Sequence, residues 1–278
     1  MPHLTTSGTL RPAIGADRLG IGVPGYAHPL LAPVEWAELL RFSRLYAAGP
    51  GHVAPLHWTV LNVAEGPGAR PDPHCLDAVG RLRNAGLRVL GHLDMTYGAR
   101  AFGELVSDAQ HFLDWYRVDG FYLDRCPAER EELPATRRLT DTLRSMLDGA
   151  GVPDAAGEDA PGGARLVLGH GTHPYAGYAE TADQLVTFSG PWTDYRWSQA
   201  AQWTASYPAS RFCHLVHGVP RTHLEEALRI ARWQGAGTIW FTDRTDRDRA
   251  GDQVGSPWEA LPGYWDEIVS RIGPGVSE

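Results

Sequence analysis

The chain has 278 residues and a formal net charge of −8 at pH 7, with 43% hydrophobic and 21% charged residues, proportions that are ordinary for a globular protein with a sizeable core. The net negative charge argues against nucleic acid as a partner, and no apolar run is long enough to cross a bilayer, so we expect no membrane partner. All 25 Lys and Arg residues are Arg, which excludes Schiff-base chemistry and covalent attachment of pyridoxal phosphate because both need a lysine amine.

Residues 1–17 are polar, contain Gly and Pro, and lack the basic start and apolar stretch of a secretory signal. We therefore predict a flexible N-terminal segment and a cytoplasmic protein. Residues 18–273 form one predicted domain. Within it, the segment 149–163 is rich in Gly, Ala, Pro and acidic residues, which predicts a mobile loop.

Short apolar runs alternate with amphipathic stretches along the chain. Eight runs have the length of buried strands: Leu19–Val23, Pro55–Val63, Leu87–Leu93, Gly120–Asp124, Arg165–Leu168, Gln184–Phe188, Phe212–His217 and Thr238–Thr242. Six stretches are long enough for helices: Pro33–Ala48, Asp72–Ala85, Ala101–Tyr116, Pro134–Leu147, Thr222–Gln234 and Leu261–Ile272. This alternation is typical of a parallel sheet wrapped by helices, and eight strands favour a single (β/α)8 TIM-type barrel of the α/β class.

In such a barrel the active site is built at the C-terminal ends of the strands. The polar and aromatic residues at these predicted ends are Tyr26, His28, Asn62, Glu65, Asp94, Tyr97, Arg100, Asp124, Arg125, His170, His173, Ser189, Trp192, His217 and Asp243. We expect them to line one hollow. Tyr26, Tyr97, Trp192, Tyr195 and Trp240 could stack there on the rings of a saccharide or another small molecule.

The run from Asp119 to Arg125 is the strongest local signal, because a short apolar strand that ends in a carboxylate delivers an acid to the barrel mouth. Asp124 is therefore the first candidate for the chemistry, and Asp94 on the neighbouring strand is the second. The alternative roles are structural: a cap or an ion pair with Arg125 for Asp124, and an ion pair with Arg125 or Arg100 for Asp94.

Further motifs support a family assignment. They are Gly22-Val23-Pro24-Gly25-Tyr26 with Pro29, Asn62 followed by Gly66-Pro67-Gly68, Gly91 with Tyr97-Gly98 and Arg100, Trp115-Tyr116, Asp119 to Asp124, Gly235-Ala236-Gly237, Thr242-Asp243 and Leu261 to Trp265. In this order and spacing, over nearly the whole chain, they resemble the spherulation-specific family 4 proteins. The resemblance implies a barrel related to glycoside hydrolase family 135, whose characterised members cleave α-1,4-linked galactosaminide polymers and are often secreted.

The chain departs from the family pattern at the expected site. Where the family usually has Asp-Glu after the fourth strand, this chain has Asp124-Arg125, and a usual Phe-Glu after the sixth strand is Phe188-Ser189. The usual Asn-Pro-Gly after the fifth strand is Gly169-His170-Gly171, and a usual Thr after the third strand is Met95. Two carboxylates of the family are therefore absent.

These departures bear on hydrolysis, which normally needs one carboxylic acid to protonate the leaving oxygen and a second carboxylate to attack or to activate water. Asp124 can still fill one of these two roles. The second group could be Asp94, Glu65, Asp243 or the acetamido group of the substrate, and Asp94 is the best placed because adjacent strands lie about 4.8 Å apart.

We expect the Arg125 guanidinium to lower the pKa of Asp124, which favours a base or a cation anchor over an acid. Arg125 itself could bind an anionic substrate or a developing oxyanion, and His170, His173 and His217 could move protons near pH 7.

Three functions remain open from the sequence. The first is a glycoside hydrolase-like enzyme with an altered site that acts on an amino-sugar or other glycoside. The second is a small-molecule cyclase, lyase or isomerase of specialised metabolism, and the third is a carbohydrate-binding protein without turnover. His170 and His173 with Asp94 or Asp124 form only a weak metal hypothesis, and Cys75, Cys126 and Cys213 lack metal-ligand spacing. We therefore expect no metal and no cofactor.

Overall fold

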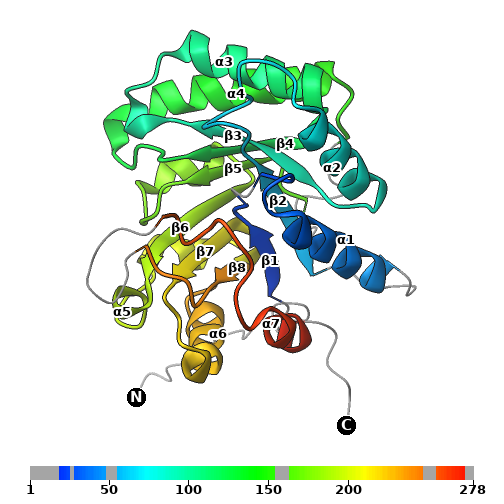
Figure 1. The fold of residues 1–278 in the computed structure, drawn as a ribbon. Coiled ribbons are helices and arrows are strands. Elements are labelled where there is room, and N and C mark those ends of the chain that lie inside the picture. Colours follow the sequence, from blue (N-terminus) through cyan, green and yellow to red (C-terminus); the bar gives the residue numbers. More distant parts are fainter. Residues whose placement is uncertain (1–18, 26–27, 48–54, 154–162, 247–254, 273–278) are drawn as a thin grey trace, which may run out of the picture.

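A computed structural model describes residues 19–25, 28–47, 55–153, 163–246 and 255–272. Its strands are β1 (Gly20–Val23), β2 (Leu56–Leu61), β3 (Val89–Asp94), β4 (Gly120–Asp124), β5 (Leu166–Gly169), β6 (Gln184–Pro191), β7 (Phe212–His217) and β8 (Thr238–Phe241). All eight are parallel to their neighbours and close into a barrel in sequence order. Helices surround this ring (Figure 1). The predicted TIM-type barrel is therefore confirmed.

The helices that cover the barrel vary in length. They are α1 (Pro33–Ala47), α2 (Pro73–Asn84), α3 (Phe102–His111), α4 (Leu133–Gly149), α5 (Trp192–Tyr195), α6 (Leu224–Trp233) and α7 (Trp265–Ile272). Between β5 and β6 the described chain forms only a short 3-10 helix, Ala176–Glu180. The predicted segment 1–17 and most of the predicted loop 149–163 lie outside the described residues.

Two predicted helix boundaries differ from the structure by four residues or more, and the other boundaries agree to within two residues. The last helix begins at Trp265 rather than at Leu261, because Pro262 and Gly263 precede it and the Gly263 amide donates to the Asp243 carboxylate at 2.9 Å. The predicted helix that ends at Tyr116 is α3 followed by a π-helical turn, Phe112–Tyr116.

A polar network spans the barrel interior. The Trp58 indole N–H on β2 donates to Gln184 Oε1 on β6 at 2.9 Å, and the Gln184 amide donates to Thr238 Oγ1 on β8 at 2.8 Å. Since β2 and β6 are four strands apart in the ring, the first of these bonds crosses the barrel. Trp58 has room there because Gly22 faces it, and a Cβ on Gly22 would lie 2.3 Å from the indole ring. The interior is thus filled by side chains.

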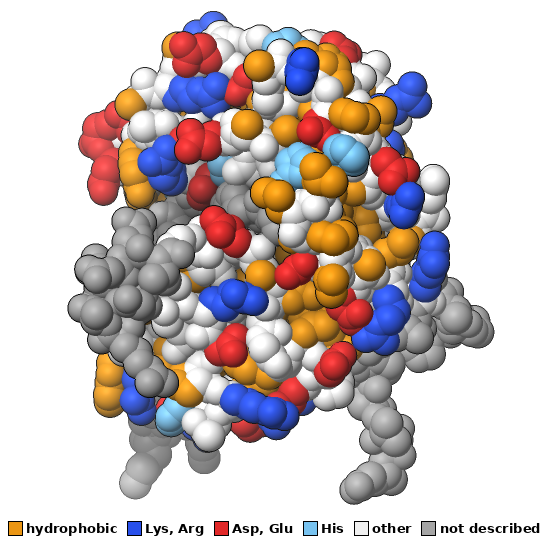
Figure 2. Space-filling view, viewed as in Figure 1, with side chains coloured by type: hydrophobic (Ala, Val, Ile, Leu, Met, Phe, Trp, Pro, Cys, Tyr) orange, Lys and Arg blue, Asp and Glu red, His pale blue; other side chains and the backbone are white. Residues whose placement is uncertain are grey.

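The surface view shows acidic and basic side chains interspersed on one face, and apolar side chains gathered over α1 and α2 (Figure 2). Leu31 and Val34 are 83% and 74% exposed in this region. Within the described ranges, no helix combines the length and the apolar character needed to cross a membrane.

Candidate active site

Two carboxylates stand side by side at the C-terminal tips of β3 and β4. The register of these strands pairs Asp94 with Asp124 directly, and each residue is the last of its strand. Both strands are buried up to these final residues, which are partly exposed. The apolar sequence of each strand therefore ends where the barrel meets solvent, and its carboxylate lies at that boundary.

Asp94 is held by an arginine and by its own loop. The Arg125 Nε donates to Asp94 Oδ1 at 2.8 Å, and a second guanidinium nitrogen donates to Oδ2. Thr96 adds its backbone N–H at 2.9 Å and its hydroxyl at 3.2 Å. Burial alone would raise the pKa of Asp94, but the hydrogen bonds from Arg125 and Thr96 outweigh burial and lower it. Asp94 is therefore an ionised counter-ion of Arg125 at neutral pH.

Asp124 has different partners. Its Oδ1 accepts the Arg125 backbone N–H at 2.9 Å, and its Oδ2 lies 3.3 Å from His92 Nε2. His92 is a buried residue of β3 whose ring stacks on Tyr122, with 6.4 Å between ring centroids. Asp124 itself keeps 30% of its side chain exposed. The carboxyl group of Asp124 therefore contacts the buried His92 on one side and solvent on the other, and a ligand can reach it from solvent.

The side chain of Arg125 forms its ion pair with one of the two carboxylates. Its guanidinium pairs with Asp94 and lowers the pKa of that carboxyl group. The alternative role considered for Asp94, an ion pair with Arg125, is the one that the structure shows.

The loops after β3 and β4 have an unusual backbone. Thr96, Tyr97 and Arg125 have φ angles of 45°, 56° and 48°, in the left-handed region that costs a non-glycine residue about 1–2 kcal/mol. Hydrogen bonds between the two loops hold these conformations: Met95 N–H donates to Asp124 O at 2.9 Å, and Tyr97 N–H donates to Arg125 O at 2.7 Å. Strain of this kind clusters at functional sites, which supports these two tips as the centre of the site.

His170 lies after β5 and is 7% exposed. Its Nδ1 lies 2.9 Å from the Pro127 carbonyl oxygen, and its ring meets Tyr178 edge-on. Burial lowers the pKa of His170 to about 4, so the ring is neutral at pH 7 and donates from Nδ1. His217 at the end of β7 is also buried, lies edge-on to Trp258, and has a pKa lowered chiefly by burial. Neither imidazole is charged at neutral pH.

Three predicted residues take part in loop structure. Asn62 accepts the Gly66 N–H at 3.0 Å, and Glu65 is exposed with a φ of 54°. Arg100 forms an ion pair with Asp108 and reaches only the backbone oxygen of Asp94, at 3.5 Å. The contacts of Asn62 and Arg100 position the loops after β2 and β3.

On the other side of the barrel, Ser189 is exposed and its backbone N–H donates to the Gly171 carbonyl at 3.1 Å. Asp243 accepts from Gly263 and so tethers the segment before α7.

The predicted aromatic residues divide into one exposed ring and several buried ones. Tyr97 is 66% exposed, and the Arg125 guanidinium lies 5.9 Å from its ring centroid. Trp192 and Tyr195 are buried and pack against each other, and Trp240 is 2% exposed against Trp265 of α7. Tyr26 lies outside the described residues. Of the aromatic rings that are described, Tyr97 is the one that offers a broad face beside the two carboxylates.

Two residues of this site were not foreseen. His92 precedes the end of β3 by two residues, and its place in an apolar run suggested only a buried position. Thr96 follows Met95, which we aligned with the usual Thr of the family. The hydroxyl one residue later binds Asp94, so the signal was present but displaced by one position.

The predicted weak metal set is not assembled. Among the described residues, His28, Asp72 and Cys75 are the one group of three or more potential ligands found close together, and His170 with His173 is not part of it. His28, which we expected at the mouth, contacts Asp72 and Cys75 at the start of α2.

Comparison with known proteins gives a family and a fold. The sequence profile of the spherulation-specific family 4 matches residues 20–272. Spherulin-4 of Physarum polycephalum is 23% identical over 153 residues, which are 54% of this chain and 42% of that protein, so the match spans less than half of the relative.

Among solved structures, Sph3 from Aspergillus clavatus in complex with GalNAc has a TM-score of 0.71 at 22% identity, and the match covers 92% of this chain and 98% of that chain. A deoxyribose phosphate aldolase from Aeropyrum pernix has a TM-score of 0.45 at 11% identity, over 82% of this chain and 86% of that chain. The likeness to Sph3 shows a shared barrel fold.

Proposed function

Because this chain belongs to the spherulation-specific family 4, we propose that it is a glycoside hydrolase-like barrel enzyme that acts on an N-acetylated amino-sugar glycoside, with Asp124 as both its acid and its base. The observation that carries the proposal is the arrangement at the tips of β3 and β4. Asp94 and Asp124 are paired in register, but Asp94 is committed to Arg125 and Thr96.

This arrangement limits the possible mechanisms. A hydrolase with two working carboxylates needs both of them available to the sugar. Asp94 has donors on both oxygens and a lowered pKa, which makes it a poor acid and a hindered nucleophile. Asp124 is the carboxyl group of the pair that supports a proton-transfer role, since it is partly exposed and lies beside His92.

The acetamido group of the substrate takes the place of the missing second carboxylate, which requires a β-linked amino-sugar, because the acetamido oxygen attacks the face of the anomeric carbon opposite the leaving group. In the first step, Asp124 gives its proton to the glycosidic oxygen while the acetamido oxygen attacks the anomeric carbon, and the leaving sugar departs as an alcohol. In the second step, Asp124 takes a proton from water as the water opens the cyclic oxazolinium ion.

The substrate class is supported by two observations. The solved relative with the same fold, Sph3, was crystallised with GalNAc, and Tyr97 presents an exposed ring beside the carboxylates, as a sugar-stacking residue does. We therefore propose that a galactosaminide ring stacks on the exposed ring of Tyr97.

Turnover of matched substrates tests the proposal. We expect the purified protein to release reducing ends from β-linked N-acetylgalactosamine oligosaccharides or the corresponding β-aryl glycoside, and to leave the β-aryl galactoside without the acetamido group intact. Asp124→Asn should lower kcat by about 10²- to 10⁴-fold, whereas Asp141→Asn on the exposed face of α4 should not change it. Equal turnover of both aryl substrates would refute participation of the acetamido group, and full activity of Asp124→Asn would refute the role of that residue.

A saccharide-binding protein without turnover is the second candidate, and the Asp94–Arg125 contact is what favours it, since it withdraws one carboxylate from chemistry. Calorimetry separates the two functions. Heat on titration with N-acetylgalactosamine oligosaccharides, together with no release of reducing ends over a broad panel, would establish the second and exclude the first.

A further inference from the structure

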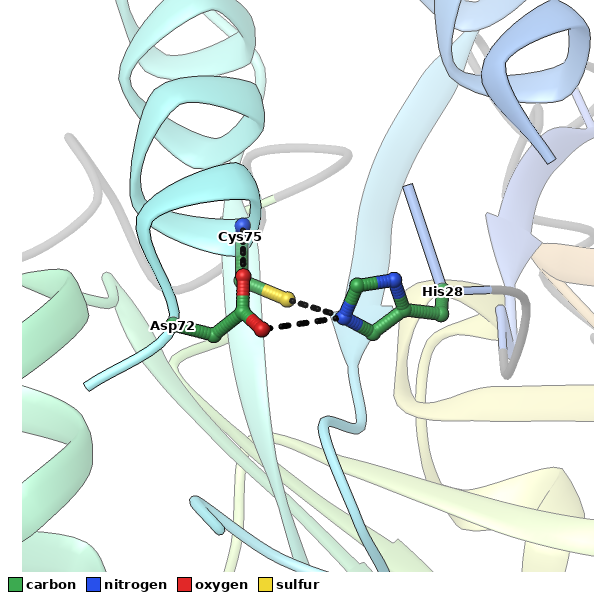
Figure 3. Close-up of side chains that lie close together, drawn as sticks. All are labelled: His28, Asp72 and Cys75. Carbon is green, nitrogen blue, oxygen red and sulfur yellow. Dashed lines mark hydrogen bonds and ion pairs between the residues drawn. The ribbon is translucent and has the colours of Figure 1, made fainter. Parts of the chain in front are cut away.

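A second group of chemically active side chains lies apart from the carboxylates of β3 and β4. His28, in the segment between β1 and α1, points towards Asp72 and Cys75 at the start of α2 (Figure 3). Asp72 is the N-cap residue of this helix and Cys75 lies in its first turn. The side chains of His28 and Asp72 are 21% and 28% exposed, and Cys75 is buried. The group therefore has a buried sulfur and a side open to solvent.

Both partners converge on one ring nitrogen. His28 Nε2 lies 3.3 Å from Asp72 Oδ2 and 3.6 Å from Cys75 Sγ, and the three ligand atoms all lie within 4.8 Å of one another. In a relay of the Cys-His-Asp kind the thiol and the carboxylate bind different nitrogens of the ring. Burial also raises the pKa of the Cys75 thiol to about 12, so it is a poor nucleophile. The arrangement does not fit a proton relay.

The same distances match the edges of a metal coordination tetrahedron. With Zn–N and Zn–O bonds of about 2.0–2.1 Å and a Zn–S bond of about 2.3 Å, tetrahedral angles separate nitrogen from oxygen by about 3.3 Å and nitrogen from sulfur by about 3.6 Å. These are the separations that the structure shows between His28 and its two partners. Two of the three donor–donor distances are therefore already those that one small ion requires, and the third lies within 4.8 Å.

The first turn of α2 orients two of the ligands. Asp72 uses Oδ1 to accept the N–H groups of His74 and Cys75, at 2.8 and 3.1 Å, which leaves Oδ2 directed at His28. The Asp72 backbone N–H is bonded to the Tyr116 hydroxyl at 3.0 Å. Such outer contacts fix the orientation of metal ligands. The hydrogen bonds that cap α2 therefore also orient the free Oδ2 of Asp72 towards His28.

We propose that His28, Asp72 and Cys75 bind one zinc ion, with water in the fourth position, and that this ion fastens the segment between β1 and α1 to the N-terminus of α2. One nitrogen, one sulfur and one oxygen donor suit a borderline ion such as Zn²⁺ or Co²⁺ and not Mg²⁺ or Ca²⁺, which prefer oxygen alone. The Cys75 thiolate and the Asp72 carboxylate together balance the charge of the ion.

Binding requires two proton movements. Cys75 gives its proton to solvent, and the His28 proton moves from Nε2 to Nδ1 so that Nε2 can bind the metal. Nδ1 lies 3.2 Å from the Leu30 backbone N–H, which donates to it. That contact must be given up, and since Leu30 is exposed, water can replace it.

Cobalt absorption tests the site directly. We expect the chelator-treated full chain to bind one Co²⁺ with a thiolate charge-transfer band and the strong visible bands of tetrahedral cobalt, and Zn²⁺ to displace it. Cys75→Ala should abolish the charge-transfer band. His28→Gln and Asp72→Asn should weaken binding by about 100-fold or more, since even an outer partner of a ligand contributes about 10- to 100-fold. Asp72→Asn keeps a capping side chain, so the helix start is preserved.

His74→Gln is the matched control, because His74 is the exposed neighbour of Cys75 and contributes no ligand atom to the group. It should bind Co²⁺ like the unmodified chain. Zn²⁺ should also raise the Tm of the unmodified chain and of His74→Gln but not of Cys75→Ala. The proposal is overturned by the absence of a charge-transfer band in the unmodified chain, or by cobalt spectra that are the same in all four variants. Neither result bears on Asp124, so the outcome is independent of the proposed hydrolase function.

Discussion

The contact between Asp94 and Arg125 can be measured with a double-mutant cycle, because the proposed function depends on it. The cycle uses Arg125→Met, Asp94→Asn and the double variant, each compared with the unmodified chain by urea unfolding. Asp94→Asn keeps a side-chain oxygen for the Thr96 amide, and Arg125→Met keeps an unbranched side chain in the same position. The cycle therefore isolates the coupling between the two charges.

The structure sets the expected size of this coupling. A buried hydrogen bond to a charged group contributes about 1.5–3 kcal/mol, whereas exposed ion pairs contribute about 0.2–1 kcal/mol. The Arg125 side chain is 47% exposed and that of Asp94 is 17% exposed, and two nitrogens of Arg125 reach two oxygens of Asp94. We therefore expect a coupling of about 1–2 kcal/mol at pH 7 and low salt, between these two limits. It should fall in 1 M NaCl, where the Debye length is about 3 Å.

The pH dependence follows from the lowered pKa of Asp94. A carboxyl group whose pKa is lower in the folded state stabilises that state above its unfolded pKa, and this stabilisation is lost as the pH falls through the folded pKa. The coupling should therefore be the same at pH 7 and pH 5. A coupling near zero at pH 7, or one that disappears between pH 7 and pH 5, would refute the assignment of Asp94 as an ionised counter-ion.

Three further predictions follow from burial and hydrogen bonding. Tyr97→Ala should weaken saccharide binding, measured by calorimetry, about three- to tenfold because an exposed ring is lost. Trp240→Phe should not weaken it, since Trp240 is 2% exposed. A larger effect of Trp240→Phe than of Tyr97→Ala would contradict the assignment of Tyr97 as the sugar-stacking residue. Gln184→Ala should lower the free energy of unfolding by about 3 kcal/mol or more, because it leaves buried groups without partners and opens a cavity, and a loss below about 1 kcal/mol would contradict this. Burial lowers the pKa of His57 to about 4 and that of His214 to about 3, so each histidine stays neutral in the folded chain while it is protonated near pH 6.5 in the unfolded chain. The free energy of unfolding should therefore fall by up to about 1.4 kcal/mol per pH unit for each histidine as the pH drops from 6.5 to 5. His57→Gln should reduce the slope of the free energy of unfolding against pH.

Much of the fold is visible in local patterns. The predicted bounds of β4 and β7 agree with the structure, because parallel strands buried on both faces appear as continuous apolar runs with sharp ends. The ends of the helices were predicted less accurately than those of these strands. The residues before Trp265 appeared helical, but the Asp243 contact to Gly263 holds them in another conformation, and that contact joins segments 20 residues apart.

The candidate site was predictable in position but not in its contacts. Strand ends placed Asp94 and Asp124 at the same edge, as the register shows. The choice of Asp94 as the partner of Arg125 depends on the left-handed backbone of Arg125 and on the hydrogen bonds between the two loops. A sequence pattern does not contain those angles, because an arginine beside two carboxylates can reach either of them.

The sequence by itself determined the alternation of strands and helices and the strand tips at which carboxylates emerge, since each depends on periodicity within a short segment. The number of strands then favoured a closed barrel. Tertiary structure decided which charges pair and which ligands meet. His28 and Asp72 are 44 residues apart, and they come together only because β1 and β2 are neighbours in the ring and α2 begins beside the segment that follows β1. Contacts of this kind depend on the path of the whole chain, and local propensity carries no information about that path.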